Sequence, residues 1–264
     1  MSTVVNNFNF LKKAVITSIK SAKEYKVSFI IQTIFMAINN TAFLFSWYVI
    51  FKRAGGDELV NYSKMLELCA ISTIGYGCTY FFFGGVQYIN RFLIDGDLDI
   101  YLLKPKNILV NVLTSKCIFS ACGDMLFGII VSAIISKSVI NFIQFICYGI
   151  YSMVFLLAVE IIYRSICVWI GDTENLASRI IFGIFITITT YPIEIFSFGI
   201  KLISFTIIPA YYAAHLPLQI IENFSIKKIA VFILSGILLL IFSVKLFNMA
   251  LKRYESGNSI SLRM

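Results

Sequence analysis

Long apolar runs separated by short polar stretches are the main pattern of this chain. Six such runs lie at Val27–Phe51, Met65–Ile89, Cys117–Ser136, Val139–Ile162, Ile180–Ile208 and Ile229–Phe247. Each is about as long as, or longer than, the roughly 20 residues that a helix needs to cross hydrocarbon. Because backbone amides cannot stay unpaired in lipid, these runs should be helices. The pattern predicts an all-α membrane protein with six transmembrane helices.

The fifth run is the most ambiguous, because apolar residues continue over about 42 positions to Ile221. Two spans would fit this length, but Pro192, Pro209 and Pro217 interrupt it, and proline breaks a continuous helix. Two spans would also place the C-terminal lysines and arginines outside. We therefore predict one span, Ile180–Ile208, followed by an extracytoplasmic re-entrant segment.

The first 26 residues follow a different pattern. In Phe8–Tyr25, apolar side chains repeat at helical spacing on one face, and four lysines fall largely off that face. Such a helix can lie in the inner headgroup layer, where anionic lipid attracts the lysines. A solvated basic start is the alternative. With the interfacial interpretation, we divide the chain into an amphipathic helix over residues 1–26 and one membrane domain over residues 27–264.

Composition and charge narrow the classes of function. Apolar residues make up 59% of the chain, and no polar stretch is long enough to hold a soluble domain. The net charge of +8 comes without a basic cluster interleaved with aromatic residues, so no nucleic-acid partner is expected. With Met1 inside, fifteen of the 22 lysines and arginines fall on the inner side. This asymmetry predicts cytoplasmic N- and C-termini.

Familiar catalytic patterns are missing from the sequence. It contains no phosphate-binding loop, no H-E-x-x-H zinc motif and no G-x-S-x-G nucleophile turn. The single histidine, His215, and the six cysteines in or beside the apolar runs offer no metal-ligand spacing. We expect neither catalytic residues nor a metal or cofactor in this chain.

Polar residues inside the predicted spans are candidate sites. Asn39 and Asn40 lie near the centre of the first span, and Asp124 lies inside the third. A charged Asp at mid-membrane costs about 2.5–3.5 kcal/mol, so it usually faces the interior of a bundle. Asp124 could be a proton site, a substrate contact or a structural hydrogen-bond partner, and the asparagines could join helices or line a substrate path. Glu160 and Arg164 could pair along one helix face.

The polar loop over residues 91–116 contains the strongest motif, RFLIDGDLDIYLLKPK over Arg91–Lys106. Gly96 permits a sharp turn, and Asp97 can cap a short helix. That helix would cover Leu98–Leu103, and Pro105 would end it. Its apolar side would consist of Leu98, Tyr101 and Leu102. A short helix of this kind could face the cytosol and dock onto a partner protein, or it could lie flat on the lipid.

This loop resembles the membrane subunits of ABC type-2 transporters, in the branch with six spans per polypeptide. That branch has a pattern close to I-x-x-G-x-L-D-x-x-L-L-x-P after its second span, and here Leu93 stands where the pattern has Ile. The matching positions are Gly96, Leu98, Asp99, Leu102, Leu103 and Pro105. The proline-bearing segment Ile208–Pro217 and the closing Leu251–Gly257 are also similar to the family, in the expected order.

The resemblance implies a coupling helix at Leu98–Leu103, seated in a groove of a separate ABC ATPase. It implies a bacterial cell-membrane complex of two ATPase copies, which hold ATP and magnesium, and two membrane subunits, identical or homologous, in contact with lipid. ATP-driven closure of the ATPases would push the coupling helices. Substrate would pass between the membrane subunits along spans one, two and five. Most members of this class export drugs, peptides, lipids or glycans, so the resemblance implies an exporter permease for a drug, peptide, lipid or other amphipathic substrate, without naming which.

Two other functions fit the residues. A proton-coupled secondary transporter would use Asp124 or Glu160; inverted repeats or paired broken helices would favour it, and the sequence shows neither. A non-transporting membrane scaffold or immunity protein would bind its partner through residues 97–105. A neighbouring reading frame that encodes a phosphate-loop ATPase would favour the permease over both.

Overall fold

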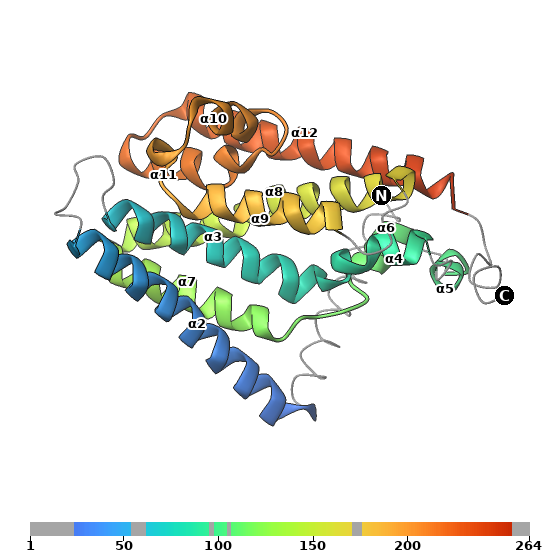
Figure 1. Cartoon of the computed structure of the whole chain (residues 1–264), viewed down its shortest axis with the longest axis horizontal. Coiled ribbons are helices and arrows are strands. Elements are labelled where there is room, and N and C mark those ends of the chain that lie inside the picture. The colour runs from blue at the N-terminus through green and yellow to red at the C-terminus, as the bar shows by residue number, and fades with distance from the viewer. Residues whose placement is uncertain (1–23, 54–61, 95–97, 105–106, 171–175, 255–264) are drawn as a thin grey trace.

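The protein is a bundle of helices in a computed structural model that describes residues 24–53, 62–94, 98–104, 107–170 and 176–254 (Figure 1). Within these ranges all regular structure is helical and no strand occurs, which confirms the predicted all-α class. The predicted interfacial helix Phe8–Tyr25 lies almost wholly outside the described residues.

Two helices form the centre of the bundle, α3 (Tyr62–Phe83) and α8 (Val139–Ile170). On one side α3 packs against α7 (Ser120–Ile135), and α7 in turn carries α2 (Lys26–Arg53). On the other side α8 packs against α12 (Ile226–Leu251). The central helices are largely buried, whereas α2 and α12 expose long apolar sides, as expected for helices that face lipid.

Four helical segments of the described chain are long and apolar enough to cross a membrane: 26–52, 62–94, 139–170 and 226–251. Two further apolar helices, α7 and α9 (Leu176–Thr190), have 16 and 15 residues. The protein is therefore a multi-pass integral membrane protein. All six predicted runs contain a helix, although two of these helices are shorter than a full span.

Small residues bring the central helices close together. A Cβ at Gly77 of α3 would lie 2.5 Å from the backbone nitrogen of Met125 in α7. A Cβ at Gly75 would lie 3.0 Å from the Ser152 side chain of α8. Any larger residue would push the helices apart, so Gly75 and Gly77 allow the close packing of α3 with its neighbours.

The second predicted span, Met65–Ile89, continues further than expected. After α3 the helix narrows to a 3-10 turn, η1 (Gly84–Tyr88), and resumes as α4 (Ile89–Ile94). The cause lies at Gly85, where a Cβ would overlap the Val112 carbonyl of the unpredicted helix α6 (Ile108–Leu113). The close approach of α6 therefore requires glycine at the point where the helix changes pitch.

The ends of the third and fourth runs also differ from the prediction. The third helix begins at Ser120 rather than Cys117, because the preceding residues form the turn from α6, where the Ile118 N–H donates to the Tyr80 carbonyl at 3.1 Å. The fourth continues past Ile162 to Ile170. Arg164 lies inside that extension, and its ion pair with Glu160 one turn earlier offsets the cost of burying either charge alone.

The fifth run is not one helix, so the prediction of a single span over Ile180–Ile208 was wrong. Helix α9 ends at Thr190, because Pro192 lacks an N–H and restricts the residue before it. The chain then doubles back through a hairpin of short helices beside α12 (Figure 1). These are η2 (Ile193–Ile195), α10 (Phe198–Phe205), η3 (Tyr211–His215) and α11 (Leu216–Glu222). The predicted re-entrant segment thus begins near residue 193 instead of 208.

Candidate functional site

A cavity of about 590 Å³ lies between α2, α3, α7 and α9. Its lining includes all three polar residues predicted for a substrate path, Asn39, Asn40 and Asp124. Helices α2, α3 and α9 belong to the first, second and fifth predicted spans, which were expected to line the substrate path. Helix α7 contributes Asp124. The structure therefore brings together residues that are far apart in the sequence.

Asp124 is buried in the wall of this cavity, with 3% of its surface exposed. The side-chain amide of Asn40 donates a hydrogen bond to Oδ1 of Asp124 at 2.7 Å. The second carboxylate oxygen, Oδ2, is buried and accepts no hydrogen bond from the described residues. A buried polar atom without a partner is unfavourable by about 1–3 kcal/mol, so the Asp124 carboxylate keeps an unused acceptor in the wall of the cavity.

The remaining wall of the cavity is mostly aromatic and aliphatic. Tyr76 and Phe182 lie with ring centroids 5.9 Å apart, and Phe43 lines the same cavity from α2. The hydroxyls of Ser72 and Thr73 donate to backbone carbonyls at 2.9 and 2.7 Å, which leaves their oxygens as acceptors. Among the described lining residues Asp124 is the only charged side chain, so the cavity carries an uncompensated acid.

A second buried polar cluster lies one helical turn along α3. The Tyr80 hydroxyl donates to Oε1 of Glu160 at 2.8 Å, and Arg164 pairs with Oε2. Arg164 also donates through Nη1 to the carbonyl of Gln87 in η1 at 2.8 Å. The predicted Glu160–Arg164 pair is thus confirmed, and both oxygens of this carboxylate have partners.

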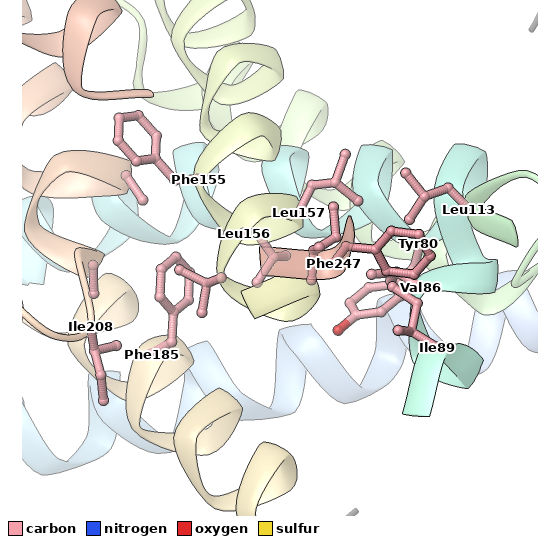
Figure 2. Packing of buried hydrophobic residues seen from close by; sticks show 14 of the residues in the cluster. Tyr80, Val86, Ile89, Leu113, Phe155, Leu156, Leu157, Phe185, Ile208 and Phe247 are labelled. Atoms are coloured by element: carbon pink, nitrogen blue, oxygen red, sulfur yellow. The ribbon is translucent and has the colours of Figure 1, made fainter. Parts of the chain in front are cut away.

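Apolar residues surround this cluster on all sides of Tyr80. Figure 2 shows Tyr80 with Val86 and Ile89 in the packed core, and Phe247 of α12 and Leu156 and Leu157 of α8 belong to the same cluster. Sequence reasoning missed Tyr80, because its partner Glu160 is 80 residues away and a tyrosine in an aromatic run carries no signal of its own. The cluster joins α3, η1 and α8 within the core.

The predicted coupling helix is present but shorter, as α5 (Asp99–Leu102). Leu98 is fully buried and belongs to the core, so it anchors the helix and does not face outward as predicted. Tyr101 packs inward against Phe92, with ring centroids 5.2 Å apart. The outward apolar side consists of Ile100, Leu102 and Leu103, which are 68%, 42% and 86% exposed. The predicted turn and end residues Gly96, Asp97 and Pro105 lie outside the described residues.

A contact from the end of α12 holds α5 in place. The Tyr254 hydroxyl donates to Oδ1 of Asp99 at 2.7 Å. Partial burial and the neighbouring Asp99 carboxylate raise the pKa of Tyr254 to about 12, which is consistent with a phenol that donates to this carboxylate. Arg253 lies over the Trp169 ring at the end of α8, 5.6 Å from its centroid. Helix α5 and the ends of α8 and α12 therefore meet at one end of the bundle (Figure 1).

Comparison with known proteins identifies one family. The family model described as ABC-2 family transporter protein matches residues 37–258, which includes the Glu160 cluster, α5 and, apart from Met36, the residues that line the cavity. Among curated proteins and solved structures, none matches this chain.

Proposed function

The chain belongs to the ABC-2 transporter family, and from this membership we propose that it is the permease subunit of an ATP-driven exporter in the bacterial cell membrane. The family implies association with an ABC ATPase. In the proposed complex, two ATPase copies bind ATP and magnesium and hydrolyse ATP. Two membrane subunits, identical or homologous, enclose the substrate path.

The observation that carries this proposal is the outward apolar side of α5. Isolated apolar side chains on a surface need no explanation, but Ile100 in the four-residue helix and Leu103 directly after it are both exposed at the end of the bundle. This arrangement fits a groove on a partner, because a helix presents its apolar side as a set of anchors. Leu98 and the Tyr254–Asp99 hydrogen bond fix α5 to the bundle, so a push on α5 would move the bundle as well.

Contacts between packed residues connect α5 to the cavity and could transmit a displacement of α5. Helix α4 connects the loop of α5 to η1, and Arg164 ties the η1 carbonyl of Gln87 to α8. Tyr80 and Tyr76 then follow on α3, with ring centroids 4.6 Å apart, and Tyr76 lines the cavity. A displacement of η1 against α8 would therefore reach the cavity wall through packed side chains. The ATPase state biases the permease between two conformations in this mechanism.

The proposed topology places α5 and both chain termini in the cytoplasm. The end of α12 lies beside α5, so α5 and the C-terminal end of the chain lie on the same side of the membrane in this topology. The excess of lysines and arginines on that side supports the cytoplasm as its location.

Co-purification with the ATPase tests the proposal. Ile100→Asp together with Leu103→Asp should release the ATPase from the membrane subunit, because two exposed anchors become charged. The matched control is Ile195→Asp, which changes an exposed apolar residue in η2, beyond the opposite end of α3, and should leave the complex intact. Undiminished recovery of the ATPase with the double variant would overturn the docking role of α5.

A further inference from the structure

We propose that the cavity binds an amphipathic organic cation, whose ammonium group pairs with the carboxylate of Asp124. This inference rests on the proposed transport function and gives the substrate of that function a chemical class. Asp124, Asn40 and Asn39 all line this cavity.

The first argument is the unpaired oxygen. Asn40 satisfies Oδ1 of Asp124, while Oδ2 accepts nothing from the described residues although it is buried. A carboxylate oxygen can only accept, so its partner must be a donor. A charged N–H donor is favoured over a neutral one, because hydrogen bonds between ionised groups are roughly twice as strong.

The second argument is the charge of the site. No lysine or arginine is among the described residues that line the cavity, so the protein itself provides no counter-ion there. An anionic ligand would be repelled by Asp124. A neutral ligand would leave the buried carboxylate without compensation, whereas an ammonium group would form the missing ion pair.

The third argument is the aromatic wall. Tyr76, Phe182 and Phe43 line the same cavity, and an aromatic face attracts an ammonium group by about 0.5–2 kcal/mol. The aliphatic part of the wall suits an apolar body attached to the cation. A cavity of about 590 Å³ is within the range of pockets that hold drug-sized molecules.

The test measures equilibrium binding of dansylcadaverine, a fluorescent primary amine, to the full chain in nanodiscs without ATPase. Two probes with the same fluorophore act as controls: N-acetyl-dansylcadaverine, which is neutral, and dansyl-aminohexanoic acid, which is an anion. The cation should bind at least about tenfold more tightly than either control, because only it can pair with Asp124.

Two sets of variants test whether the charge of Asp124 causes the preference for the cationic probe. Asp124→Asn should remove the preference for the cation, while Glu67→Gln, the same chemical change on α3 outside the cavity, should preserve it. Gly183 lines the cavity, and a Cβ there meets nothing within 4 Å. Gly183→Lys should therefore place a tethered ammonium in the cavity and block the cation, and Gly183→Met should block it much less although it fills similar space.

The outcomes separate this inference from the proposed function. Equal binding of the three probes, or an unchanged preference in Asp124→Asn, would overturn the cation class and leave ATPase docking as it stands. If Asp124→Asn does not fold, the Gly183 pair decides alone: equal loss with Lys and Met would mean that the site recognises apolar bulk only. Release of the ATPase is measured on α5 variants and does not depend on the probe.

Discussion

Two buried carboxylates in this bundle have different surroundings. Glu160 and Asp124 are each 3% exposed, and both lie in apolar helices. Both oxygens of Glu160 have protein partners, Tyr80 and Arg164, and the pair is enclosed by the core. Asp124 has one partner, Asn40, and its other oxygen is unpaired beside a cavity. On the account proposed above, Glu160 with its complete set of partners serves the fold, and Asp124 with its incomplete set serves a ligand.

Arg164→Met should give the largest loss of stability. It removes the counter-charge and leaves Glu160 buried without compensation, which is destabilising by about 3–5 kcal/mol. Unfolding of the detergent-solubilised chain measures this loss. The double variant Glu160→Met with Arg164→Met should recover most of it, because no charge then remains. A single variant as stable as the parent would contradict a structural role for the pair.

Tyr80→Phe should have an intermediate effect. It leaves Oε1 of Glu160 without its donor and so gives Glu160 the half-paired state of Asp124. A buried acceptor that loses its partner destabilises by about 1–3 kcal/mol. The same unfolding measurement applies, with Tyr48→Phe on the exposed part of α2 as the matched control. No difference between the two variants would show that the Tyr80 hydrogen bond does not stabilise the fold.

Asp124→Asn should have the smallest effect on stability, within about 1 kcal/mol in either direction. Asparagine keeps the size of the side chain and can still accept from Asn40, and it removes a charge that the protein pairs only in part. The free energy of unfolding of this variant, measured in parallel with that of Arg164→Met, compares the contributions of the two sites directly. A loss as large as that of Arg164→Met would make Asp124 a folding residue and end the distinction.

Local patterns in the sequence predicted most of the helices and one of the two polar clusters. Runs of about 20 apolar residues require helices in lipid, and the spacing of Glu160 and Arg164 places them on one helix face, so both follow from the chain itself. Helix ends were less predictable where tertiary contacts decide them, as at Gly85, which α6 approaches, and at Ser120. Pro192 was a local signal, and its effect on the fifth span was underestimated.

The candidate sites depended more strongly on contacts between distant segments. Asn40 and Asp124 are 84 residues apart, and nothing in either run identifies the other as its partner. Helical spacing placed Leu98 on the outward side of α5, but the core takes it inward and Ile100 and Leu103 are exposed instead. The contact of Tyr254 with Asp99 spans 155 residues and has no sequence signal.

Photo-crosslinking from α5 tests the central claim most directly, because it reports what touches this helix in an intact membrane. Benzoylphenylalanine would replace Leu103 in one variant and Ile195 in the control, with the ATPase co-expressed. We predict a covalent adduct between position 103 and the ATPase, and none from position 195. Adducts of position 103 with lipid alone, in membranes that contain the assembled complex, would contradict the assignment of α5 as the site that receives work from ATP.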